Sequence, residues 1–293
     1  MPPIPAPRAS GFTTTTQVPL FWAAYGPTGA PRLLVLHGGP GAHHDYLLPQ
    51  MLELGGDYEL VFYDQRGGGQ SKTDDRAPIT WQTHVEDLDR VVDELRIEPL
   101  TLLGYSWGGL LAMLYAIEAA AGRTRHRPRR LVLIDPAPVT RAYRHVFERE
   151  FSRRQSDASV AQLRAELASS GLRERDPEAY RQRAFELSVA GYFADPVATH
   201  DLTPFRVTGR VQQSVWESLG DFDLLAHGKL DSIDVQTLII HGRQDPIPLA
   251  SSEAAAKAMS ATLVVVESSG HVPYVEQPRA LFTAVREFLA RTE

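Results

Sequence analysis

The chain has 293 residues, of which 43% are hydrophobic and 23% are charged, and its net charge is −6. This is the composition of an ordinary globular protein, with length for one large α/β domain or two smaller ones. The negative charge excludes a global field that would collect nucleic acid or an anionic membrane surface. The absence of cysteine excludes disulfides, thiolate chemistry and cysteine zinc sites.

Two local segments bear on partners and compartment. Residues 123–130, R-T-R-H-R-P-R-R, form a basic cluster that we interpret as a solvated loop, because no aromatic side chains are interleaved with the arginines. The amino terminus is rich in proline, and nowhere do about 18 apolar residues run together. We therefore expect a cytoplasmic protein that binds neither nucleic acid nor a membrane, of unknown oligomeric state.

Six short apolar runs predict the strands of a sheet. Such runs, separated by helical patterns, are typical of strands buried on both faces of a parallel sheet. They lie at 33–36, 60–63, 100–103, 131–134, 238–240 and 263–266. Helical spacing is seen at 85–95, where Thr83-x-x-Glu86 is a capping signal, and at 110–117 and 278–289. The predicted fold class is α/β, a mostly parallel sheet flanked by helices.

The first run is followed by H-G-G-P-G, residues 37–41. Glycine lets the backbone approach a substrate closely, and an oxyanion is stabilised by backbone N–H groups aimed at the developing charge. We predict that the N–H of Gly39 is one such donor and that His37 anchors the loop. The alternative is an ordinary glycine-proline turn.

The next two segments do not indicate a cofactor. His43 and His44 are adjacent and lack the spacing of a metal site, so we predict no metal. D-Q-R-G-G-G-Q-S, residues 64–71, follows the second run but lacks the lysine and the glycine spacing of a nucleotide-binding loop. We expect no cofactor, and we expect this segment to support the loop at 37–41.

G-Y-S-W-G, residues 104–108, lies where a predicted strand turns into a predicted helix. This is the context of a G-x-S-x-G nucleophile turn, in which glycines are needed because the strained backbone leaves no room for side chains. Ser106 is the predicted nucleophile, and the backbone N–H of Trp107 is the second predicted oxyanion donor. Alternatively, the glycines only pack a helix against a strand.

Residues after the later strands complete a predicted catalytic triad. Asp245 follows the run at 238–240 and His271 follows the last run, which gives the chain order Ser, Asp, His. The histidine would be the general base and the aspartate would fix its tautomer. Asp135, directly after the run at 131–134, is the competing acid, and we favour Asp245.

The alternation of strands and helices fails between 136 and 228. This part has helical spacing and no strand run, so we predict a helical cap at 136–228 and a core domain made of 1–135 and 229–293. Candidate residues for an apolar lining of the cap are Tyr192, Phe193, Phe205 and Trp216.

Together these motifs resemble those of one known family. They occur in the order H-G-G-P-G, D-Q-R-G-G-G-Q-S, G-Y-S-W-G-G, G-R-Q-D and G-H-V-P between residues 37 and 271. The sequence resembles the prolyl iminopeptidase family of serine α/β-hydrolases, which includes the tricorn-interacting aminopeptidases. The resemblance implies an α/β-hydrolase fold with a helical cap inserted after the sixth strand. It also implies release of an N-terminal residue, often proline, from short peptides.

The family further implies that carboxylates hold the free amino group of the substrate, since a buried ammonium must be paired. In some members a glutamate directly follows the catalytic acid and another lies in the cap. Here Pro246 follows the acid, and Thr203-Pro204-Phe205 contains no carboxylate. We predict Glu217 as a substrate-binding residue, and the other candidates are Glu148, Glu186, Asp195 and Asp201.

Two other functions stay open. The same triad would serve a carboxylesterase, a lactonase or a hydrolase of small amides, with the aromatic cap residues lining an apolar pocket. The chain would otherwise be a ligand-binding homologue without catalysis. In each case the expected partner is a small molecule or a short peptide.

Overall fold

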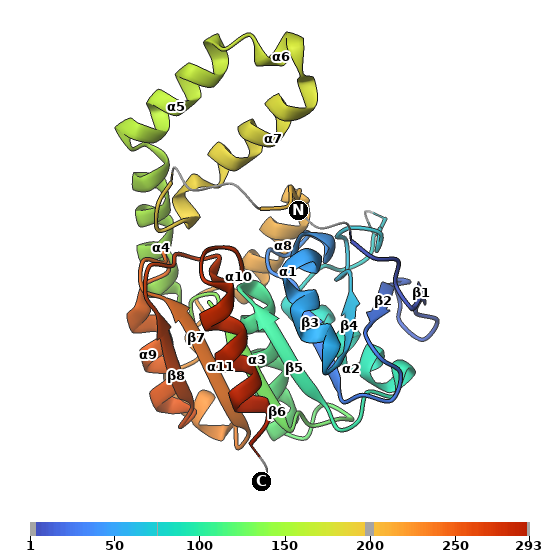
Figure 1. Cartoon of the computed structure of the whole chain (residues 1–293). Helices are drawn as coiled ribbons and strands as arrows, with labels where there is room; N and C mark the ends of the chain where they lie inside the picture. Colours follow the sequence, from blue (N-terminus) through green and yellow to red (C-terminus); the bar gives the residue numbers. More distant parts are fainter. Residues whose placement is uncertain (1–3, 75, 197–201, 292–293) are drawn as a thin grey trace.

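The computed structural model describes residues 4–74, 76–196 and 202–291, and its centre is one eight-stranded sheet (Figure 1). The strands lie in the order β1-β2-β4-β3-β5-β6-β7-β8. Neighbours from β4 to β8 in this order are parallel, and β1 and β2 add an antiparallel edge. The bounds are β1 (Ala9–Phe12), β2 (Phe21–Tyr25), β3 (Arg32–Leu36), β4 (Glu59–Tyr63), β5 (Thr101–Tyr105), β6 (Arg130–Ile134), β7 (Gln236–Gly242) and β8 (Thr262–Val266).

The six predicted runs are the six parallel strands β3 to β8, so the predicted α/β class is confirmed. The sequence did not indicate β1 and β2. Side chains of β1 alternate between half-buried and exposed, as on an edge strand, and give no continuous apolar run. In β2 the centre is Ala23-Ala24, and alanine is a weak strand former.

Helices cover both faces of the sheet. Side chains of β3 alternate between two apolar clusters: Leu34 and Leu36 join the cluster that contains α2, α3 and α9, and Leu33 and Val35 join the one with α1 and α11. Figure 1 shows α11 in front of the sheet and α3 behind it. The bounds are α1 (Leu48–Met51), α2 (Trp81–Leu95), α3 (Trp107–Ala120), α9 (Leu249–Ala258), α10 (Pro273–Glu276) and α11 (Pro278–Leu289).

Helix α2 begins earlier than the capping signal predicted. Its N-cap is Thr80, whose hydroxyl accepts the N–H of Thr83, while the hydroxyl of Thr83 accepts the N–H of Thr80. Thr83 therefore has the role that a glutamate has three residues into a capping box, and the predicted cap at Thr83 is wrong.

An inserted helical region lies between β6 and β7. Figure 1 shows α4 leaving the sheet, α5 to α7 projecting away from it, and α8 returning over it. The helices are α4 (Arg141–Gln155), α5 (Ala158–Ser169), α6 (Leu172–Arg175), α7 (Pro177–Ser188) and α8 (Gly209–Leu219). Short 3-10 turns lie at Asp45–Leu47, Leu52–Gly56, Ala190–Tyr192, Ala226–Gly228 and Leu230–Ser232. Helices inserted after the sixth strand are thus confirmed, and the domain bounds at 136 and 228 stay a prediction.

The basic segment at 123–130 is paired with neighbouring acids. Arg123 contacts Glu118, and Arg125 lies 2.8 Å from a carboxylate oxygen of Asp93. These pairs agree with a solvated loop. Among the described residues, every helix is too short or too polar to cross a membrane.

Candidate active site

Ser106 lies on a sharp turn between β5 and α3. Its backbone has φ 54° and ψ −117°, in a region that residues other than glycine rarely adopt. A Cβ on Gly104 would lie 2.4 Å from the carbonyl oxygen of Gly108, and one on Gly108 would lie 2.1 Å from that of Leu36. The neighbouring glycines are therefore required by close backbone approach, as predicted.

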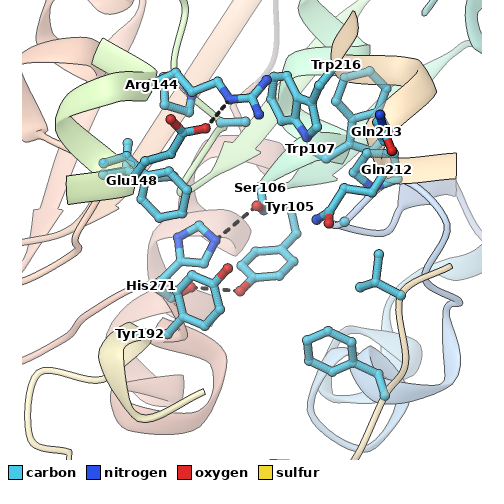
Figure 2. Close-up of a pocket in the computed structure, with 18 of the residues that line it drawn as sticks. Tyr105, Ser106, Trp107, Arg144, Glu148, Tyr192, Gln212, Gln213, Trp216 and His271 are labelled. Atoms are coloured by element: carbon cyan, nitrogen blue, oxygen red, sulfur yellow. Dashed lines mark hydrogen bonds and ion pairs between the residues drawn. The ribbon is translucent and has the colours of Figure 1, made fainter. Parts of the chain in front are cut away.

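Three predicted side chains meet at this turn. The Nε2 atom of His271 lies 2.9 Å from Oγ of Ser106, and its Nδ1 atom lies 2.8 Å from Oδ2 of Asp245. The second oxygen of Asp245 accepts the N–H of Ile247 at 2.7 Å. Figure 2 shows His271 pointing at Ser106. Of the two candidate acids, it is Asp245 and not Asp135 that contacts the histidine.

The electrostatics of His271 suit a base. Its burial lowers its pKa to about 4, so the imidazole is neutral near pH 7. The contact with Asp245 places the ring proton on Nδ1 and leaves Nε2 free to accept the hydroxyl proton of Ser106. The arrangement can transfer a proton from the serine to the histidine.

His271 is held from two sides. Its ring lies between those of Tyr105 and Tyr192, with centroid distances of 5.2 and 4.9 Å. The hydroxyl of Tyr105 donates to the carbonyl of His271 at 2.9 Å, and the N–H of His271 donates to the carbonyl of Tyr192 at 2.7 Å. The sheet and the helical insertion therefore both fix its position.

A carboxylate strengthens the second of these attachments. Glu276 in α10 accepts the N–H of Ala194, in the insertion, at 2.8 Å and the N–H of Gly270 at 2.6 Å. Gly270 also has no room for a side chain, because a Cβ there would lie 2.1 Å from the carbonyl oxygen of Tyr192. The histidine turn and the insertion are packed backbone against backbone.

The two predicted oxyanion donors border the same pocket as Ser106. Gly39 follows β3 with φ 59°, and its N–H has no hydrogen-bond acceptor among the described residues. Trp107 is the first residue of α3, where an N–H has no intrahelical partner. Two free backbone donors are therefore available to a developing oxyanion.

Gln65 connects these two segments, and the sequence reasoning did not single it out. Its Oε1 accepts the indole N–H of Trp107 at 2.7 Å, and its Nε2 donates to the carbonyl of His37 at 2.8 Å. Its own N–H donates to Nε2 of His37 at 3.0 Å. All three residues are buried. The predicted support of the loop at 37–41 by the segment at 64–71 is confirmed, and the motif was the signal for Gln65.

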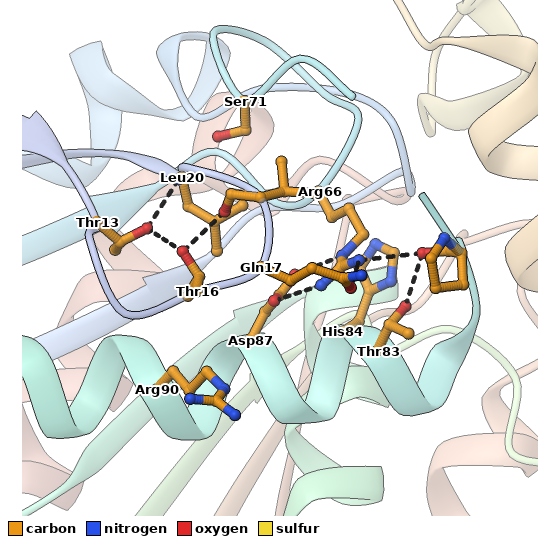
Figure 3. Close-up of polar contacts among 12 residues, drawn as sticks. Thr13, Thr16, Gln17, Leu20, Arg66, Ser71, Thr83, His84, Asp87 and Arg90 are labelled. Carbon is orange, nitrogen blue, oxygen red and sulfur yellow. Dashed lines mark hydrogen bonds and ion pairs between the residues drawn. The ribbon is translucent and has the colours of Figure 1, made fainter. Parts of the chain in front are cut away.

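The same segment is fixed to α2 by a buried ion pair (Figure 3). The guanidinium of Arg66 contacts both oxygens of Asp87, at 2.7 and 2.8 Å, and also donates to Gln17 and to the carbonyl of Pro78. Side chains of both members of the pair are at most 3% exposed. The segment thus has a structural role beside the site.

A pocket of about 750 Å³ lies above Ser106. The four residues predicted to bind substrate all border it, namely Tyr192, Phe205, Trp216 and Glu217. Phe193 does not, because its side chain is fully buried in the core cluster that contains α11. The prediction for Phe193 as a lining residue is wrong, since the chain turns it inward at the end of the 3-10 turn at 190–192.

The pocket is also bordered by three polar side chains that were not predicted, those of Arg144, Gln212 and Gln213. Arg144 contacts Glu148 at 2.8 Å, and its guanidinium lies 4.0 Å above the ring of Trp216. Gln212 and Gln213 line the opposite side (Figure 2). No signal could have found Arg144, because α4 is rich in arginine and glutamate and its charged residues look alike in sequence.

The candidate carboxylates differ in their surroundings. Glu148 and Glu217 border the pocket. Glu217 accepts from the amide of Gln213 at 2.7 Å and forms no ion pair within the described residues. Glu186 and Asp195 do not border the pocket, and Glu186 instead lies 2.8 Å from Arg183. Asp201 lies outside the described residues.

Comparison of the sequence with known proteins gives related peptidases. The chain is 26% identical over 282 residues to a proline iminopeptidase of Clostridium botulinum, which covers 89% of this chain and 90% of the relative. It is 44% identical over 96 residues to a proline iminopeptidase of Lactobacillus delbrueckii subsp. lactis. That match spans 31% of this chain and about a third, 32%, of the relative's length. The predicted resemblance to this group is confirmed at moderate identity.

Comparison of the structure with solved structures gives the same fold. A proline iminopeptidase of Mycobacterium smegmatis superposes with a TM-score of 0.69 at 22% identity, covering 96% of this chain and 97% of that one. An enol-lactonase of Burkholderia xenovorans superposes with a TM-score of 0.65 at 21% identity, covering 96% of this chain and 100% of that one. At such identities the likeness is one of fold.

A family model described as the alpha/beta hydrolase family matches residues 33–285, which is most of the chain. The matched range includes the six parallel strands except for Arg32, the first residue of β3, and it includes the inserted helices, Ser106, Asp245 and His271. The chain belongs to the alpha/beta hydrolase family.

Proposed function

We propose that the protein is a serine hydrolase of the proline iminopeptidase type, which releases the N-terminal residue of short peptides. The observation that carries this proposal is the continuous contact from Asp245 through His271 to Ser106, which opens into the pocket of about 750 Å³. The moderate identity to proline iminopeptidases over most of the chain supports the choice of substrate.

In this mechanism, Oγ of Ser106 attacks the carbonyl carbon while its proton passes to Nε2 of His271. Asp245 stabilises the imidazolium, and the N–H groups of Gly39 and Trp107 bind the oxyanion. Collapse of the tetrahedral intermediate breaks the peptide bond, and His271 gives its proton to the leaving amine. A water molecule then loses a proton to His271 and attacks the ester carbonyl. Collapse of the second tetrahedral intermediate breaks the ester bond and frees the amino acid, and His271 returns the proton to Oγ of Ser106.

Glu217 is the proposed partner of the substrate's amino group. An ammonium inside a pocket needs an opposite charge, and pairing it places the scissile bond one residue from the chain end. Among the described residues, the carboxylates that border the pocket are Glu148 and Glu217. Glu148 is paired with Arg144, whereas the contact of Glu217 is with the neutral amide of Gln213. Glu217 can therefore accept a new cation without losing an existing one.

A second candidate is hydrolysis of small esters or lactones by the same triad. It is favoured by the ion pair with Arg144, which neutralises the pocket carboxylate of Glu148, and by the aromatic lining of Tyr46, Phe147 and Phe205. Such a pocket suits an acyl group without a charge.

The experiment compares proline p-nitroanilide with a short-chain p-nitrophenyl ester, with Ser106→Ala as the blank. We expect cleavage of the anilide, none after its amine is acetylated, and covalent labelling of Ser106 by a fluorophosphonate. Glu217→Gln should raise KM for the anilide about tenfold or more and leave KM for the ester unchanged, because it removes one charge. Glu148→Gln is the matched control and should change KM less.

Cleavage of the ester without cleavage of any amino-acyl anilide would contradict the peptidase proposal and support the second candidate. Failure to turn over either substrate or to react with the fluorophosphonate would contradict both, and would point to a ligand-binding homologue.

A further inference from the structure

A second carboxyl group lies directly behind the proposed triad. Asp135 directly follows β6 with φ 41°, and its side chain is fully buried. Its Oδ1 atom accepts the N–H of Gly242 at 2.8 Å. One polar atom each of Asp135, His241 and Asp245 lie within 4.8 Å of one another. Two buried acids therefore lie side by side behind the proposed triad.

The other oxygen of Asp135 has no donor. Its Oδ2 atom is buried, and among the described residues it accepts no hydrogen bond from an N–H or hydroxyl group. His241 cannot supply one, because its Nε2 atom donates to the carbonyl of Ile247 at 3.1 Å and its Nδ1 atom accepts the hydroxyl of Ser252 at 2.9 Å. An ionised oxygen in this position would be desolvated without compensation.

The group that does face Asp135 at hydrogen-bond range is the carboxyl of Asp245. Two ionised carboxylates so close in a low-dielectric interior repel each other, and a single shared proton removes the repulsion. A proton on Oδ2 of Asp135 also gives that atom the partner it lacks.

We propose that Asp135 is a positioning residue for the proposed triad: its carboxyl is protonated and donates a hydrogen bond from Oδ2 to Asp245. The inference rests on the proposed function. The two carboxyls then carry one negative charge between them, and it resides on Asp245, where it faces His271. Asp135 holds that carboxylate in place when the imidazolium forms, without adding a second charge.

The pKa of Asp135 also supports a protonated carboxyl at neutral pH. Burial, and then the charge of Asp245, raise the pKa of Asp135 well above its usual range. The groups that face it come from several elements. They are Tyr105 at the end of β5, His241 in β7, Asp245 and His271 in loops, and Tyr274 in α10. Burial keeps both tyrosines neutral and lowers the pKa of His241 to about 4. Arg154 in α4 is the cation whose charge reaches Asp245.

The first test measures proton uptake on folding and needs no substrate. At neutral pH the unfolded chain has lost the proton of Asp135, whose unfolded pKa is about 3.9, whereas the native protein keeps it. The logarithm of the unfolding constant of the wild type should therefore rise between about pH 5 and 7 more steeply than that of Asp135→Asn, by about one unit per pH unit. Parallel slopes would overturn the proposal.

The second test compares Asp135→Asn with Asp135→Ala in turnover. The amide N–H of asparagine can make the same hydrogen bond, so Asp135→Asn should keep kcat/KM within about threefold, whereas Asp135→Ala should lose about tenfold or more in kcat with little change in KM. Equal losses in both variants would show that the negative charge matters and would overturn the proposal. If the wild type itself turns over neither substrate, the proposed function fails, and the unfolding slopes still decide the state of Asp135.

Discussion

Gln65 is the residue whose side chain touches both halves of the proposed oxyanion hole. It accepts the indole N–H of Trp107 and donates to the carbonyl of His37. Because an oxyanion hole works through donors held in advance at the right place, a residue that fixes both donors affects the rate without touching the substrate.

We predict that Gln65→Leu lowers kcat about tenfold or more with little change in KM. Leucine has a similar size but leaves the indole N–H of Trp107 and the carbonyl of His37 buried without partners. The measurement is steady-state kinetics on whichever chromogenic substrate the wild type cleaves. Gln70→Leu is the control on the same loop, since the side chain of Gln70 is exposed. Equal activity of the two variants would mean that Gln65 only fills space.

At the scale of elements, helix α2 is held to the core by charge as well as by apolar packing. Arg66 and Asp87 are both buried and bonded twice, while Asp93, on the same helix, is 47% exposed and pairs with Arg125 at the surface. The two pairs therefore differ in what the loss of one partner costs. A buried charge that loses its partner has no water to solvate it, whereas an exposed charge does.

Asp87→Ala should lower the free energy of unfolding by about 3 to 5 kcal/mol, because it leaves Arg66 buried and unpaired. Asp93→Ala should cost less than about 1 kcal/mol, as exposed pairs do. Chemical denaturation followed by fluorescence gives both values. Similar losses in the two variants would mean that the guanidinium of Arg66 finds other acceptors, such as Oε1 of Gln17 or the carbonyl of Pro78, which both lie at 3.1 Å.

Comparison of the elements with the sequence shows which features a pattern can predict. The parallel strands were predictable because burial on both faces demands continuous apolar runs, and the triad was predictable because its members follow such runs. The edge strands β1 and β2 were not, since one exposed side breaks the run. The polar lining of the pocket was not either: Arg144 and Arg149 lie on the same helix, yet only Arg144 borders the pocket. That difference arises from the tertiary structure, which places Arg144 over the ring of Trp216 in α8 and which no local pattern encodes.

At the scale of the whole molecule, α4 contacts the loop that carries the proposed catalytic acid. Arg154 donates to the carbonyl of Gln244 at 2.5 Å and lies 2.7 Å from Glu150 on its own helix. Arg153 pairs with the same glutamate but is 67% exposed. One arginine therefore joins the insertion to the core, and its neighbour does not.

We expect Arg154→Met to raise the rate of thermolysin cleavage within residues 141–188 several-fold and to lower kcat/KM about threefold. Methionine keeps the apolar stem and removes only the charged end. Arg153→Met should leave both quantities unchanged. If the two variants are cleaved at the same rate, the contact with Gln244 does not hold the insertion in place.

The backbone contact between Gly270 and Tyr192 has a consequence for how specificity can change in this architecture. Helices α5 to α7 project away from the sheet, so lengthening or trimming them leaves the histidine turn untouched. The stretch from Tyr192 to Ala194 has no such freedom, since Glu276 and Gly270 are fitted to it. A chimera that receives the whole insertion of a relative would also have to import the matching turn around His271, so substrate preference and catalytic base would have to be transplanted as one piece.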